Sequence, residues 1–117
     1  MAKATSPVQF TRELPPFIAA GELSRRERAL SWVQPGNATN SAVVFDVGLA
    51  VIDLLDAAFL LDPEATTPRQ IVVVSKSQTY IAVVCANSIL VVILNDASRL
   101  AHALALLTEE RNRRDAA

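Results

Sequence analysis

Residues 70–94 read QIVVVSKSQTYIAVVCANSILVVIL, and this stretch decides the fold. It contains three apolar runs, at residues 70–75, 79–86 and 88–94, separated by short polar breaks. Breaks of this length leave room only for tight turns between antiparallel neighbours. The stretch is therefore predicted to form a three-stranded antiparallel meander. Because the runs are apolar at both alternating positions, both faces of the sheet are expected to be covered.

The element that covers the first face of the sheet is predicted before the meander, in the long apolar segment 42–61. Its charged residues, Asp46, Asp53 and Asp56, recur at spacings of seven and three, which places them on one face of a helix. Gly48 weakens a helix by about 1 kcal/mol and the β-branched valines around it by a few tenths each. A helix is the prediction, and a hairpin turning at Gly48 is its alternative.

The second cover is predicted after the meander, as a helix over residues 97–113 whose inner face is Leu100, Ala103, Leu104 and Leu107. The last ten residues, TEERNRRDAA, are interpreted as a charged and solvated end whose arginines suit a helix C-terminus. The predicted organisation is a flexible N-terminus of residues 1–7, one α+β domain over residues 8–110, and a charged tail over residues 111–117.

The N-terminal third carries weaker signals. Residues 8–14 and 17–23 are predicted as two short strands that form a hairpin around Pro15-Pro16. Ser24 and Glu27 have the spacing of a capping box, so a short helix over residues 25–33 is expected to follow. The predicted fold class is α+β, with the meander and an N-terminal hairpin in one antiparallel sheet sandwiched between helices.

The composition argues against several classes of function. The chain has 117 residues, enough for one domain with a sizeable core, and 51% of them are hydrophobic. Its 11 basic and 12 acidic residues lack the basic excess of nucleic-acid binders. The three aspartates of segment 42–61 argue against a membrane span, because each costs roughly 2.5–3.5 kcal/mol near a bilayer centre. The N-terminus lacks the apolar stretch of a secretory signal.

Residues that carry chemistry are scarce. His102 is the single histidine and Cys85 the single cysteine, so neither a His/Cys metal cluster nor a Ser/His/Asp set is present in the sequence. Cys85 lies inside an apolar run, which indicates a buried, inert thiol. We therefore expect no catalytic residues, no metal and no cofactor, and an intracellular setting.

Two groups of charged residues are candidate partner contacts. Asp46, Asp53 and Asp56 form a stripe that either faces solvent or meets a basic partner. Arg25, Arg26 and Arg28 crowd one short segment. They form either a solvated face, or an ion-pair patch for an acidic partner or a nucleotide-binding protein.

The segment RQIVVVSKSQTYIAVVCANSILVVILNDASRL, residues 69–100, resembles the Roadblock family of dynein light chains and GTPase adaptors. The order and length of its three apolar runs match that family, as does the polar break at Asn95-Asp96. The stretch FIAAGEL, residues 17–23, is similar to the family's second strand. The resemblance implies a five-stranded antiparallel sheet between helices that pairs side by side with a second such domain.

The leading hypothesis is a non-catalytic scaffold subunit, a homodimer or heterodimer, that docks a small GTPase or a motor or trafficking complex. Its partner-facing elements would be the aspartate-striped helix and the edge strand of the meander, including Gln70, Val72 and Val74. Its location would be the cytoplasm, including the periphery of a cytoskeletal or membrane-bound complex. The alternatives are a small-ligand sensor or minor enzyme with a helix–sheet pocket reached by Asp46, Asp53 or Cys85, and an obligate subunit of a larger assembly.

Overall fold

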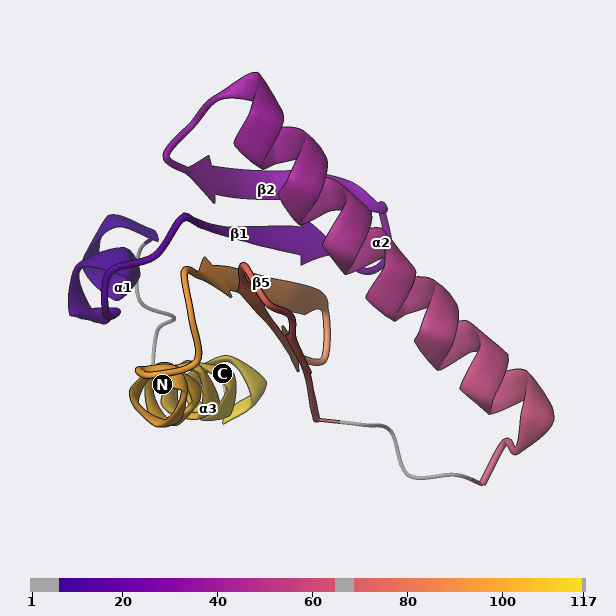
Figure 1. Ribbon diagram of the computed structural model, residues 1–117. Helices are drawn as coiled ribbons and strands as arrows, with labels where there is room; N and C mark the ends of the chain where they lie inside the picture. Colours follow the sequence, from indigo (N-terminus) through magenta and orange to yellow (C-terminus); the bar gives the residue numbers. More distant parts are fainter. Residues whose placement is uncertain (1–6, 65–68, 117) are drawn as a thin grey trace.

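The structure is a computed structural model that describes residues 7–64 and 69–116. One sheet of five strands runs in the order β2-β1-β5-β4-β3, and every neighbouring pair is antiparallel (Figure 1). The elements are α1 (Pro7–Glu13), β1 (Ala19–Ser24), β2 (Ala29–Gln34), α2 (Ala38–Leu61), β3 (Gln70–Val74), β4 (Thr79–Val84), β5 (Ser88–Leu94) and α3 (Leu100–Ala116).

The predicted meander is confirmed as β3, β4 and β5. Val72 of β3 lies opposite Ile81 of β4, and Ile81 lies opposite Val92 of β5, so the three runs pair in sequence order. The first strand, β1, joins the far side of β5, with Gly21 opposite Val91. This arrangement places β5 at the centre of the sheet and leaves β3 and β2 as its two edges.

Helices pack on both faces of the sheet, as the apolar runs predict, although the edge strand β3 stays largely exposed. In β5 the side chains alternate, so that Ile89, Val91 and Ile93 pack with α2, whereas Leu90 and Val92 pack with α3 and α1. Figure 1 shows α2 on one side of the sheet and α3 on the other. The sandwich of one sheet between helices is therefore confirmed.

The helix prediction for segment 42–61 is confirmed, and the hairpin alternative is wrong. Asn37 caps α2 by accepting a hydrogen bond from the backbone N–H of Asn40 at 2.8 Å. Gly48 sits where α2 crosses β1, and a Cβ atom there would lie 2.9 Å from Cδ2 of Leu23. The glycine thus weakens the isolated helix but permits the close packing that stabilises it in the fold. None of the helices in the described part of the chain is long and apolar enough to cross a membrane.

The strand predicted at residues 8–14 is wrong, because this segment forms α1. Phe10 and Leu14 are four residues apart, a spacing that fits one face of a strand and one face of a helix equally well. Both side chains are buried, and the Phe10 ring meets Trp32 edge-on with 6.3 Å between centroids. Residues 1–6 of the predicted flexible N-terminus lie outside the described residues.

The helix predicted at residues 25–33 is also wrong, because a tight turn is followed there by β2. The Oγ atom of Ser24 does accept the backbone N–H of Glu27 at 3.2 Å, but this bond closes a hairpin turn between β1 and β2. A bulge shifts the register between Glu22 and Leu23, so that Leu30 and Val33 both face α2. Two apolar residues three positions apart on one face of a strand have the same spacing as two residues on one face of a helix. This coincidence explains why the sequence predicted a helix here. β1 therefore forms its hairpin with β2, and the predicted hairpin with residues 8–14 is wrong.

Candidate functional site

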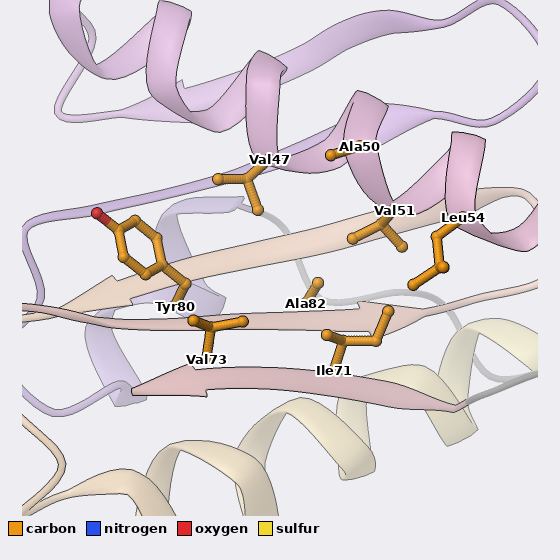
Figure 2. Close-up of a pocket in the computed structure, with 8 residues that line it drawn as sticks. All are labelled: Val47, Ala50, Val51, Leu54, Ile71, Val73, Tyr80 and Ala82. Carbon is orange, nitrogen blue, oxygen red and sulfur yellow. The ribbon is translucent and has the colours of Figure 1, made fainter. Parts of the chain in front are cut away.

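An apolar groove lies between α2 and the β3 edge of the sheet (Figure 2). α2 packs mainly on β1, β5 and β2, so it leaves β3 largely uncovered on this face. Figure 2 shows side chains of α2 pointing down to side chains that rise from β3 and β4. The groove has a volume of about 360 Å³ and is lined by Val47, Ala50, Val51, Leu54, Ile71, Val73, Tyr80 and Ala82.

The chemistry of this groove suits binding by apolar contact. Among the residues that the structure describes, its lining carries no carboxylate, imidazole or thiol. Tyr80 is the one polar side chain among them, and it donates its hydroxyl hydrogen to Gln78 at 2.6 Å. Leu54 and Val73 are each 53% exposed, which is unusual for large apolar side chains on facing elements. More apolar surface continues along the end of α2, where Phe59, Leu60 and Leu61 are exposed. Figure 1 shows these last turns of α2 extending beyond the sheet.

The strand beside the groove is an open sheet edge. β3 pairs with β4 on one side, and its sequence QIVVV carries no charge. Of the residues predicted to face a partner, Val72 packs toward α3, and by strand alternation Gln70 and Val74 lie on that same face. Ile71 and Val73 are the β3 residues that line the groove. The sequence therefore identified the strand but not which of its faces carries the groove.

The two predicted charged groups meet in the structure through Arg28, Asp53 and Asp56. Arg28, in the turn after β1, donates to Asp53 at 3.0 Å and to Asp56 at 2.8 Å, both on α2. All three side chains are about half exposed, so each ion pair contributes on the order of 1 kcal/mol or less. Asp46 is exposed nearer the N-terminal end of the same helix.

A second ionic cluster is buried, and no pattern in the sequence indicated it. Arg114 of α3 donates its Nε hydrogen to Glu110 at 2.7 Å and a second N–H to Glu22 of β1. Trp32 donates its indole N–H to the same Glu22 carboxylate at 2.8 Å. The segment interpreted as a solvated tail therefore belongs to α3 and attaches it to the sheet, which corrects that interpretation for Glu110 and Arg114.

Opposing effects set the pKa values in this cluster. Burial alone would raise the pKa of Glu22, but hydrogen bonds from Arg114, Ser88 and Trp32 and the charge of Arg114 outweigh it and lower the pKa. Burial would lower the pKa of Arg114, and the hydrogen bonds and charges of Glu22 and Glu110 raise it instead. Both groups are therefore held in their charged forms.

Cys85 and His102 do not form a reactive centre. Cys85 is buried as predicted, and burial raises the pKa of its thiol to about 11. It lines a polar cavity of about 300 Å³ together with Glu22 and Arg114, which already bind each other. His102 is exposed on α3. No group of three or more His, Cys, Asp or Glu side chains in the described residues could hold a metal ion.

Comparison with known proteins identifies the class of fold. No model of a known protein family matches the chain, and no curated protein matches it. Among solved structures it is similar to Roadblock/LC7 domains, and the fold of this chain is the Roadblock fold. The resemblance of residues 69–100 to that family is thereby confirmed at the level of the fold.

Three of these structures cover most of the chain. The Roadblock/LC7 domain from Streptomyces avermitilis has a TM-score of 0.64 at 18% identity, over 88% of this chain and 89% of that one. MglB of Myxococcus xanthus has a TM-score of 0.72 at 11% identity, over 92% and 86%. The gliding protein MglB from Thermus thermophilus has a TM-score of 0.68 at 10% identity, over 93% and 82%.

Proposed function

We propose that this protein is a non-catalytic adaptor subunit that pairs with a second copy of itself through the α2–β3 groove. The observation that carries the proposal is an open apolar groove directly beside an uncharged edge strand. Exposed large apolar side chains on one contiguous surface are costly in water and typical of interfaces. The pairing buries Leu54 and Val73, and α2 of each copy lies against the other.

A second copy suits this surface because a two-fold interface matches each element with itself. When two β3 strands pair antiparallel about a two-fold axis, residue i of one copy faces residue j of the other and j faces i, so β3 residues meet only β3 residues. Like charges on this strand would therefore meet and destabilise the pair. β3 consists of Gln70, Ile71 and three valines, so no such repulsion arises. Unpaired N–H and C=O groups along the edge gain hydrogen-bond partners in the same contact.

A stable pair requires a sizeable share of the molecular surface. A standard interface removes about 800 Å² from each partner. That is roughly 12% of the 6881 Å² that the chain exposes. The groove and the β3 edge supply apolar surface for this contact, and exposed Phe59, Leu60 and Leu61 add more at the end of α2.

The partner of the pair is proposed to be a small GTPase or a motor or trafficking complex. Support comes from the Roadblock fold, which the chain shares with MglB and with a Roadblock/LC7 domain. An apolar groove without acid–base groups further supports a role in docking instead of turnover. In the pair, the outer faces of the two α2 helices form one platform for this partner.

Light scattering of the purified chain tests the pairing. The wild-type chain should have twice its chain mass of 12.6 kDa at micromolar concentration. Ala50→Glu places a charge in the groove and should return the mass to that of a monomer, because an unpaired buried charge is strongly disfavoured in an interface. Ala105→Glu is the matched control, since Ala105 is an exposed residue of α3, and it should leave the doubled mass unchanged.

The proposal fails if the wild-type chain has monomer mass at high micromolar concentration, or if both glutamate variants keep the doubled mass. A chain that doubles its mass only when mixed with another Roadblock-fold domain would identify a heterodimer and overturn pairing with itself.

The GTPase role predicts that a paired chain binds a purified small GTPase with different affinity in its GTP-bound and GDP-bound forms. Equal or absent binding of both forms, across the GTPases of the source organism, would contradict that role.

A further inference from the structure

We propose that the turn between β1 and β2 is a second docking site, which binds an acidic peptide segment of a protein partner. The site contains Arg25, Arg26 and Arg28, three cations within four residues. It lies beside the middle of α2 in Figure 1, whereas the groove opens toward β3. The two surfaces are therefore separate, and the proposal goes beyond the pairing function.

The turn forms one wall of a shallow hollow of about 380 Å³. The other walls come from α2 and from the turn between β4 and β5, so three segments distant in sequence converge here. The lining consists of Arg25, Arg26, Arg28, Ile52, Asp56, Ala86 and Asn87. It contains three guanidinium groups, one carboxylate and one amide around a small apolar area.

Arg25 is held in position before any ligand arrives. Its Nη1 atom donates to the carbonyl oxygens of Cys85 at 3.0 Å and Ala86 at 3.3 Å. Among the described residues these are the bonds of its side chain, so Nε and Nη2 remain available to a carboxylate. A guanidinium fixed at one edge loses little conformational entropy when its planar fork binds a carboxylate.

Arg26 is the most available cation of the site. Its side chain is exposed, and it forms no ion pair with any residue in the described part of the chain. It also lines the hollow, so its charge lies next to Arg25. Two neighbouring cations that form no ion pair with a described residue favour a ligand that brings its own carboxylates.

Arg28 shows how such a carboxylate is bound. Its backbone has φ of 53°, a left-handed conformation that costs a non-glycine residue on the order of 1 kcal/mol. Its guanidinium binds Asp53 through Nη1 and Asp56 through Nη2. These ion pairs are half exposed and weak, so an acidic segment can replace one aspartate at little cost.

The mixed lining favours a peptide over a phosphate or a nucleic acid. Asp56 would repel a dense polyanion, but it can accept a hydrogen bond from a peptide N–H. Asn87 can both donate to and accept from a peptide backbone. The net charge of −1 for the whole chain provides no wider positive field for a polyanion.

Fluorescence anisotropy with the full chain tests this site. The probe is a short labelled peptide in which Asp and Glu alternate with Gly and Leu, and its control replaces Asp and Glu by Asn and Gln. The wild-type chain should bind the acidic probe at least tenfold more tightly at low salt, and raised salt should reduce the difference. Arg26→Gln should weaken binding about tenfold, whereas Arg12→Gln, at an exposed position of α1, should leave it unchanged.

A second variant separates docking from a structural role of the turn. Replacing both Asp53 and Asp56 by Asn removes the carboxylates that compete for Arg28, so the acidic probe should bind several-fold more tightly. None of these variants should change the solution mass, which distinguishes this site from the pairing groove. Equal binding of the acidic and neutral probes would overturn the proposal. So would stronger binding of inorganic phosphate or an oligonucleotide than of the peptide, or weaker binding by the Asp53→Asn, Asp56→Asn chain.

Discussion

Arg114→Met is the substitution that examines the buried ionic cluster most sharply. Methionine keeps most of the length of the side chain and suits a helix, so the change removes mainly the charge and its hydrogen bonds. Glu22 and Glu110 would then remain close together in the interior without Arg114 between them. Arg111→Met is the matched control, because Arg111 is partly exposed on the same helix and its side chain forms a long bond to Asn112.

The expected cost follows from burial. Removing one partner of a fully buried ion pair costs about 3–5 kcal/mol. Here the Arg114 and Glu22 side chains are 14% and 12% exposed, and Glu22 keeps its hydrogen bond from Trp32. We therefore expect the lower end, about 3 kcal/mol, which on a chain of this size lowers the melting temperature by roughly 12 °C. Arg111→Met should change the free energy of unfolding by no more than about 0.5 kcal/mol.

Chemical denaturation at fixed protein concentration, at pH 7 and again near pH 4, measures the free energy of unfolding of the wild type and of both variants. In the variant, burial raises the pKa of Glu22 because the opposing guanidinium is gone. Lowering the pH then neutralises the buried Glu22 of the variant, whereas in the wild type it weakens the ion pair with Arg114. The difference in free energy of unfolding between wild type and Arg114→Met should therefore shrink near pH 4. A difference below about 1 kcal/mol at pH 7, or one equal for Arg114→Met and Arg111→Met, would refute the reasoning.

Three further predictions concern Gly21, Glu22 and Cys85. Gly21→Ala should destabilise by about 1–3 kcal/mol in denaturation, because its Cβ would lie 2.6 Å from Cγ1 of Val44 and 2.9 Å from a strand carbonyl oxygen. The folded-state pKa of Glu22 is lowered, so the contribution of Glu22 to the free energy of unfolding should be complete above pH 4.5 and decline as the pH falls below it. When the free energy of unfolding is measured against pH, a Glu22→Gln chain should lack this part of the decline. Cys85, with a pKa of about 11, should react with a thiol reagent at pH 7.5 much more slowly in the folded chain than in denaturant, and equal rates would contradict its burial.

The sequence predicted those parts of the fold that repeat a simple period over many residues. The meander follows from three long apolar runs, and α2 from the spacing of Asp46, Asp53 and Asp56. The errors arose where a short segment satisfied two periods at once. Phe10 and Leu14 fit a strand or a helix, and the bulge in the β1–β2 hairpin puts Leu30 and Val33 on one face at a helical spacing.

The candidate sites were less predictable because they depend on tertiary contacts. Arg28 and Asp56 are 28 positions apart, and only the fold of the hairpin against α2 brings them together. Glu22 and Arg114 are 92 positions apart, and nothing in the local pattern of either segment indicates a partner. The groove itself reflects where α2 lies on the sheet, so Ile71 and Val73 could not be distinguished from Val72 and Val74 by composition.

Amide hydrogen exchange at two protein concentrations tests the pairing of β3 edges most directly. The sheet carries its own control, because β2 forms the opposite edge. If two copies join through β3, the amides of Gln70–Val74 should exchange far more slowly at high concentration than at low, while those of Ala29–Gln34 stay unchanged. If the amides of β3 exchange as fast as those of β2, and independently of protein concentration, the β3 edge stays exposed to solvent and the proposed pairing is contradicted.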